Sequence, residues 1–160
     1  MNVKKVMKIS VVVGGIIFIL IQFIQPDRTN PQFDPAWTMQ SQLNVPSNIN
    51  SLLERGCKDC HTNRTVWPFY AYVAPASWLV SHDVTEGRKN FNMSEWGKYK
   101  FSKKVQKLSG IYEAVTDRSM PLPKYVPLHP EAKLSDAERD TLAHWAQSEA
   151  EKMMGGEEEH

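Results

Sequence analysis

"RGCKDCHTN", residues 55–63, decides the fold, because it contains both cysteines of this 160-residue chain and a histidine directly after the second. Two thiols at this spacing on one helical turn can form thioethers to the two vinyl groups along one side of a haem. The next residue then presents its imidazole to the iron. The motif therefore predicts one covalently attached haem c, bound through Cys57 and Cys60 and ligated by His61.

Three other uses of two nearby cysteines explain the motif less well. A disulfide between Cys57 and Cys60 would close so small a loop that it removes little entropy from the unfolded chain, and it leaves His61 without a role. A thioredoxin-like redox site should follow a strand in a βαβ unit, whereas here a helical pattern leads into the motif. A zinc site needs four ligands, and the adjacent Cys60 and His61 are poorly placed to converge on one ion.

An apolar run from Ile9 to Ile24 follows Lys4, Lys5 and Lys8 near the N-terminus. As a helix it would extend roughly 24 Å, a little short of a ~30 Å hydrocarbon core. We expect residues 1–26 to form an uncleaved transmembrane anchor, and a cleaved signal peptide is the alternative. The lysines place the N-terminal end in the cytoplasm, so both alternatives predict that the rest of the chain lies in the periplasm or another extracytoplasmic space.

The rest of the chain divides into three parts. Residues 27–46 contain three prolines and no sustained period, which predicts an extended linker or an arm lying over the domain. Residues 47–154 show helical periodicity and no convincing strand, which predicts one mostly α domain. Residues 155–160 are expected to form a disordered acidic tail.

Three helices are predicted in the domain from apolar side chains repeated every three or four residues. The first has Ser47 or Asn48 as its cap and delivers Cys57 at its end. The second spans residues 102–117. The third begins at "SDAE", residues 135–138, which has the capping-box pattern. Gly56 is expected to admit the third helix close to the first. The predicted buried side chains are Ile49, Leu52, Leu53, Val105, Leu108, Tyr112, Val115, Leu142, Trp145, Ala146 and Met153.

A haem ligated by His61 has a second axial position that a downstream side chain could fill. Met120 is favoured, because flanking prolines hold its loop extended and present the thioether from a rigid segment. Of the aromatic side chains between residues 67 and 96, Trp67 and Tyr70 are favoured for haem contact because they lie near His61 in sequence. The other candidates for the axial position are His82, Met93, His129 and His144.

Four stretches together resemble the bacterial haem-binding-domain proteins, which are small membrane-anchored relatives of cytochrome c. The resemblance covers about residues 47–148 and implies covalent haem, His61 as the proximal ligand and Met120 as the distal ligand. A carbonyl near Pro68 or Pro75 should accept the Nδ1 hydrogen of His61, and similarity to class I cytochromes c favours Pro75. The stretches are "CKDCHTN", "WPFYAYVAPASWLVSHDVTEGR", "MSEW" and "MPLPKYVPLHPEAKLSDAER".

A cytochrome c-like domain with His/Met ligation predicts an electron-transfer protein and not an enzyme, because a saturated iron has no open position for substrate. The alternatives are a haem sensor or peroxidase-like subunit with a displaceable distal ligand, and a structural haem subunit of a membrane complex. The formal net charge of +1 gives no global reason to expect nucleic-acid binding. A redox partner could dock on the densest basic cluster, formed by Lys98, Lys100, Lys103, Lys104 and Lys107.

Overall fold

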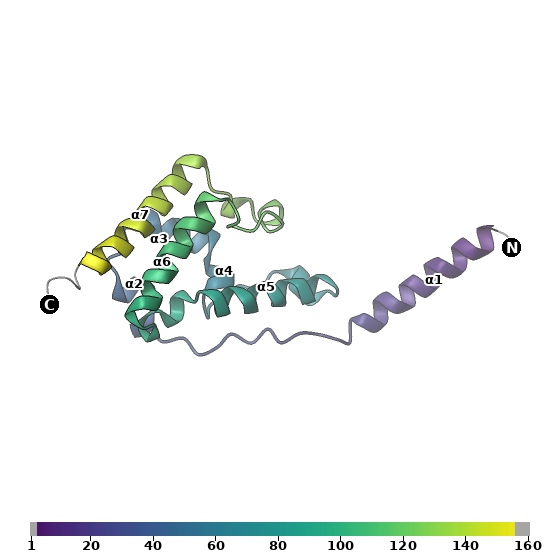
Figure 1. Ribbon diagram of the computed structural model, residues 1–160. Coiled ribbons are helices and arrows are strands. Elements are labelled where there is room, and N and C mark those ends of the chain that lie inside the picture. The colour runs from purple at the N-terminus through teal and green to yellow at the C-terminus, as the bar shows by residue number, and fades with distance from the viewer. Residues whose placement is uncertain (1–2, 156–160) are drawn as a thin grey trace.

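The computed structural model describes residues 3–155 and shows a group of packed helices with one helix, α1, extending away from it (Figure 1). No strand occurs among these described residues, and helices account for most of them, so the protein is mostly α as the periodicity predicted. In chain order the elements are α1 (Val3–Ile21), η1 (Pro35–Trp37), α2 (Met39–Gln42), α3 (Ser47–Gly56), α4 (Lys58–His61), η2 (Phe69–Tyr72), α5 (Ala76–Asn90), η3 (Met93–Lys98), α6 (Phe101–Thr116), η4 (Val126–Leu128), η5 (Pro130–Ala132) and α7 (Asp136–Gly155).

The hydrophobic core lies where α3, α6 and α7 meet, with α6 and α7 packed side by side (Figure 1). Leu108 of α6, Leu142 of α7 and Trp96 of η3 are fully buried there. Burial of these side chains supplies most of the stability of the domain, since each large apolar side chain contributes about 1.5–3 kcal/mol when removed from water. The other buried members are Met39, Ile49, Leu52, Leu53, Phe91, Met93, Val115, Leu134, Ala143, Trp145, Ala146 and Ala150.

The three predicted helices are confirmed as α3, α6 and α7, with boundaries that differ from the prediction by one or two residues. The capping box is also confirmed: the Ser135 amide donates to the Glu138 carboxylate at 2.8 Å, and the Glu138 amide donates to the Ser135 hydroxyl at 3.3 Å. The predicted cap of α3 is wrong, because Pro46 occupies that position without a side-chain hydrogen bond.

The expected role of Gly56 is also wrong. A Cβ on Gly56 would meet the Pro121 side chain at 3.3 Å and the Ala132 carbonyl at 3.7 Å. The neighbour admitted by the missing side chain is therefore the segment between α6 and α7, and not Leu142 or Trp145 of α7.

α5 packs against α4, and its sequence gave no helical signal strong enough to predict it. A Cβ on Gly87 of α5 would lie only 2.5 Å from the carbonyl oxygen of Cys60. Real Cβ atoms do not approach that closely, so glycine at this position is what lets α5 contact the backbone of α4.

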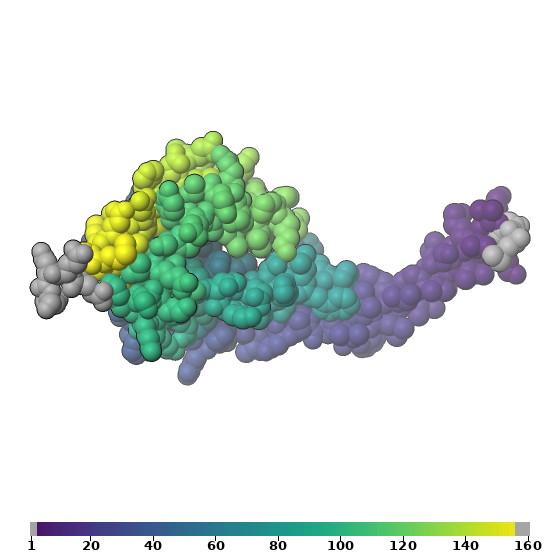
Figure 2. Space-filling model, viewed as in Figure 1, coloured from purple at the N-terminus to yellow at the C-terminus, as the bar shows by residue number. Residues whose placement is uncertain are grey.

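Residues 27–46 form an arm that lies along the domain beside α5 (Figure 2). The Asn30 side chain donates to the Thr65 carbonyl at 2.9 Å, and the Gln32 carbonyl accepts from the Asn63 side chain at 2.8 Å. Met39, near the end of this arm, is fully buried in the core. Of the predicted acidic tail, only Gly155 is described, as the last residue of α7, and residues 156–160 lie outside the described part of the chain.

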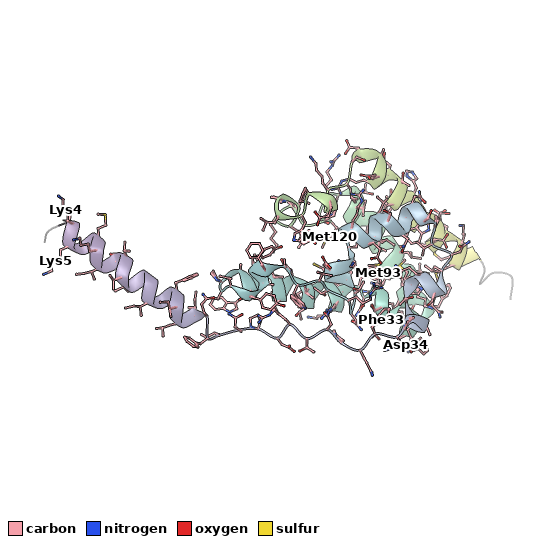
Figure 3. All side chains as sticks on the ribbon, turned by 180° about the vertical axis from the view of Figure 1, so that it is seen from behind. Lys4, Lys5, Phe33, Asp34, Met93 and Met120 are labelled. Carbon is pink, nitrogen blue, oxygen red and sulfur yellow. The ribbon has the colours of Figure 1, made fainter. Side chains whose placement is uncertain are left out.

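α1 carries the apolar N-terminal run. Among residues 3–155, no helix combines the length and the apolar character needed to cross a membrane. α1 ends at Ile21 rather than Ile24, and it includes three lysines, two of which are labelled at its far end in Figure 3. The expected transmembrane anchor over residues 1–26 is therefore not supported.

Candidate haem site

The two cysteines and the histidine of the motif lie within one short helical turn, residues 57–61. α3 ends at Gly56, Cys57 bends the chain, and α4 carries Cys60 and His61, whose amide donates to the Cys57 carbonyl at 2.9 Å. Both thiols are free. Burial raises the pKa of Cys57 to about 12, with the neighbouring Cys60 adding to the effect. Burial, together with Asp59 and Asp83, raises the pKa of Cys60 to about 11. At neutral pH both groups are therefore thiols.

His61 has a fixed orientation. Its Nδ1 lies 2.9 Å from the carbonyl oxygen of Phe91, at the end of α5. A carbonyl only accepts, so Nδ1 is the donor and Nε2 keeps its lone pair for a metal. Burial lowers the pKa of His61, although backbone hydrogen bonding to Phe91 and Gly87 opposes this, so the neutral imidazole is the favoured form. The acceptor is Phe91 and not Pro75, whose carbonyl instead accepts from the Trp78 amide at 3.1 Å.

A cleft in two connected parts opens in front of His61. One part has a volume of about 170 Å³ and the other about 520 Å³. Three residues line both parts: His61, Asn90 and Met120. Cofactor sites in proteins commonly enclose ~300–1,000 Å³, so the cleft has the size of a cofactor site. Cys57 lines the larger part and Cys60 the smaller one, which places one thiol on each side of His61.

Met120 reaches this cleft from the loop that follows α6. Arg118 takes a left-handed conformation with φ 64°, which ends the helix and turns the chain. The Met120 amide donates to the Ala114 carbonyl at 3.0 Å, and the Met120 carbonyl accepts from Arg139 of α7 at 2.7 Å. Arg139 also donates to the Val115 carbonyl at 3.1 Å, so it ties the methionine loop to α6 and α7 together.

None of the other four axial candidates lines either part of the cleft. Met93 is buried in the core on η3, apart from Met120 (Figure 3). His82 and His144 are exposed on helices, and His144 Nδ1 donates to the Asp140 carbonyl at 2.7 Å. His129 lies 2.6 Å from the hydroxyl of Tyr70.

Neither of the two favoured aromatic side chains lines the cleft. Tyr70 lines a smaller cavity of about 40 Å³ together with Cys60 and Tyr125. Trp67 is half-buried, and its indole Nε1 has no hydrogen-bond partner among the described residues. Its neighbours in sequence, Val66 and Pro68, line the same small cavity, whereas Trp67 itself does not.

Sequence reasoning missed several residues of the site. Tyr125 lines the cleft, its ring stacks on the His129 ring at 3.9 Å, and its hydroxyl donates to the Asp59 carboxylate at 3.2 Å. Burial raises the pKa of this hydroxyl, and the negative charge of Asp59 adds to the effect. Asn90 lines both parts of the cleft. Gly87 and Arg139 hold α4 and the methionine loop in place. The prolines around Tyr125 and the single glycine in "VTEGRKN" were the features of the sequence that could have indicated these residues.

These residues fit a covalently bound haem. Two protonated thiols, one neutral imidazole with a free Nε2 and one thioether converge on a cleft of cofactor size, and soft sulfur with imidazole is a ligand set typical of haem iron. The fold and the cleft thus define a small helical haem-binding protein.

Comparison with known proteins agrees with this class. Residues 16–148 match the model of a family described as "haem-binding domain", so the chain belongs to the haem-binding domain family. Over 100 residues, or 61% of this chain, the sequence is 33% identical to "Cytochrome c peroxidase Ccp" of Escherichia coli (strain K12). That match covers 22% of the peroxidase, so the chain spans only a small part of its relative's length. No solved structure matches the chain.

Proposed function

We propose that this protein is a monohaem c-type cytochrome that transfers single electrons, with the haem bound covalently through Cys57 and Cys60 and ligated by His61 and Met120. The observation that supports this most directly is that His61 and Met120 line the same cleft, with a cysteine in each of its two parts. A haem held in this way changes oxidation state by one electron without a position open to substrate.

The residues of this chain have separate roles in the proposal. Cys57 and Cys60 form the thioethers. The Phe91 carbonyl holds the imidazole of His61 in one tautomer and orientation, which raises the basicity of its Nε2. Arg139 holds the Met120 backbone, so the thioether is presented from a tethered loop. The apolar lining from Leu53, Phe91, Ile111 and Val115 keeps water from the site.

Absorption spectra of the oxidised, haem-loaded protein test the ligation. Sulfur ligation should give a weak band near the red end of the visible spectrum, lost in Met120→Ala and kept in Met154→Ala, which alters an exposed methionine of α7. Persistence of the band in Met120→Ala would refute Met120 as the ligand. Mass analysis tests attachment, because Cys57→Ser and Cys60→Ser should each prevent one thioether. A haem-free mass for the parent protein would refute covalent attachment.

The similarity to a segment of a cytochrome c peroxidase supports a second candidate function, in which the domain supplies electrons to a peroxidase-like partner or is itself a peroxidase-like subunit. An electron carrier and a peroxidase-like subunit differ in what the isolated chain does with hydrogen peroxide. A pure electron carrier should reduce an added acceptor and leave hydrogen peroxide unconsumed. Peroxide turnover by the isolated haem-loaded chain would instead show a displaceable distal ligand and would exclude the electron-carrier function as stated.

A partner surface is proposed next to the cleft, on the basic side of α6. Lys107 lines the larger part of the cleft, and Lys104 lies over the Trp96 ring at 5.9 Å. Lys103 lies in the first turn of the same helix, and Lys100 is its N-cap. Positive charge at a haem edge would steer an acidic redox partner at low ionic strength. Lys107→Glu should slow electron exchange with an acidic acceptor several-fold at low salt, whereas Lys133→Glu, on an exposed residue outside the cleft lining, should not. Equal rates for both variants would remove the docking role.

The proposed location is a membrane surface, with the haem domain on the extracytoplasmic side. Support comes from α1, whose apolar side chains are exposed; Val11 and Leu20, for example, are 72% and 59% exposed. Separation of cell membranes from soluble fractions tests this location, and recovery of the full-length protein only in a soluble fraction would refute it.

A further inference from the structure

One end of the haem domain carries an exposed apolar surface formed by Phe69, Tyr72, Val73, Trp78 and Leu79, here called the apolar tip. These side chains come from η2, from Val73 directly after it and from the first turn of α5, and Phe69 is 83% exposed. Soluble proteins seldom expose so many large apolar side chains together unless the surface has a partner. In Figure 1 this end of α5 is the end of the domain that faces α1.

Hydrogen bonds join the apolar tip to the end of α1. The Gln22 side chain donates to the Ala74 carbonyl at 3.0 Å and accepts from the Ala74 amide at 2.9 Å. The Trp78 indole donates to the Ile24 carbonyl at 2.6 Å, and the Ser81 hydroxyl donates to the Asp27 carbonyl at 3.1 Å. The domain is thus held at the end of α1 by a defined junction and is not on a loose tether.

Exposed apolar side chains continue from α1 to its junction with the tip. Its apolar side chains are exposed all round the helix, since Val12, Val13 and Phe18 at non-equivalent angular positions are all 47–60% exposed. Phe23, between α1 and the tip, is 82% exposed. A partner helix would cover one face, whereas lipid covers all of them.

We infer that the apolar tip lies in the headgroup region of the membrane that α1 contacts, so that the haem domain contacts lipid directly. This rests on the proposed membrane location of the protein. Tryptophan and tyrosine are favoured at that depth because each ring has an apolar body and one polar group. Arg28, whose guanidinium lies 4.6 Å from the centre of the Tyr72 ring, adds a positive charge for lipid phosphate.

This arrangement sets the position of the cleft relative to the membrane. α5 runs for 15 residues from the tip to Asn90, which lines both parts of the cleft, and that length corresponds to roughly 22 Å. The helix therefore acts as a rigid spacer between lipid and haem. Its partners would be proteins whose redox groups lie at a similar height above the same membrane.

The test uses the full-length haem-loaded protein and vesicles of phosphatidylcholine with a minor share of phosphatidylglycerol. In that protein the native thiols are bound to haem, so Phe69→Cys and Leu79→Cys each introduce one site for a polarity-sensitive fluorophore. Asp140→Cys, on the exposed side of α7, is the matched control. With vesicles, labels at 69 and 79 should shift to an apolar emission and be quenched by nitroxide lipid, while the label at 140 stays in water.

The outcomes distinguish the proposed membrane attachment from the proposed contact of the apolar tip with lipid. Flotation with vesicles while the labels at 69 and 79 stay in water would refute lipid contact by the tip and leave membrane attachment standing. Absence of flotation would refute membrane attachment and this inference with it. Equal quenching at all three positions would show non-specific adsorption and would also overturn the inference. Gln22→Ala, which removes both bonds to Ala74, should weaken quenching at 69 and 79 without reducing flotation.

Discussion

Gly87→Ala tests whether the close contact between α4 and α5 controls the haem site. A Cβ on residue 87 would lie 2.5 Å from the Cys60 carbonyl oxygen and 3.0 Å from both the Cys60 carbonyl carbon and its Cβ. Carbon and oxygen normally approach no closer than about 3.3 Å, so the two helices must separate by roughly 0.8 Å. The obstructing atoms belong to the backbone of a short helix, and no side-chain rotation can relieve the contact.

The expected cost follows from two opposing contributions. Overpacking of this kind destabilises proteins by about 1–3 kcal/mol. Alanine is favoured over glycine inside a helix by about 1 kcal/mol, which offsets part of that cost. The net destabilisation should therefore be up to about 2 kcal/mol. The change also moves Phe91, whose amide donates to the Gly87 carbonyl, and so it should lengthen the 2.9 Å contact between the Phe91 carbonyl and His61.

Denaturant unfolding of the haem-loaded protein measures the effect, and the reduction potential reports on the His61 hydrogen bond separately. Thr85→Ala is the control, because it changes an exposed position of the same helix and should alter stability by less than ~0.5 kcal/mol. If Gly87→Ala is as stable as the parent and keeps the same potential, the contact with Cys60 does not hold the site and the reasoning from Gly87 fails.

Three further predictions concern the methionine loop, the capping box and the apoprotein. Arg139→Ala should destabilise the domain by ~1–3 kcal/mol and weaken the red-end absorption band, because the Met120 carbonyl loses its charged donor; an unchanged band would contradict this. Hydrogen bonds from Ser135 lower the pKa of Glu138 from 4.5. The ionised carboxylate therefore stabilises the fold fully above pH 4.5, and this stabilisation is lost as the pH falls through the folded-state pKa. Glu138→Gln should therefore be less stable than the parent at neutral pH, and in denaturant unfolding the difference should disappear as the pH falls below the folded-state pKa; a constant difference would refute this. Without haem, the His61→Ala protein should show low helicity by circular dichroism, because the cleft leaves much apolar surface unburied; a cooperative melt with native-like helicity would be the opposite result.

The sequence by itself determined the features that depend on local spacing. The positions of Cys57, Cys60 and His61 are set by one helical turn, and helical periodicity located α3, α6 and α7 because one face of each is buried in the core. The capping box at Ser135 was readable for the same reason, since its partners are three residues apart. Such patterns involve residues only a few positions apart, so they can be recognised in the sequence alone.

Only the tertiary structure decided which distant groups meet. The acceptor for His61 is the Phe91 carbonyl, thirty residues away, and a backbone carbonyl carries no residue-type signal. Gly56 faces Pro121 rather than α7, Gly87 faces Cys60, and Arg139 holds Met120, because each contact depends on how the helices and the loop pack. Whether α1 is long and apolar enough to span a membrane depended on where the helix ends, and the chain leaves the helix at Ile21, where Gln22 bonds to Ala74 of the domain. Contacts between segments far apart in the chain are set by the packing of the whole domain, so a local pattern does not reveal them.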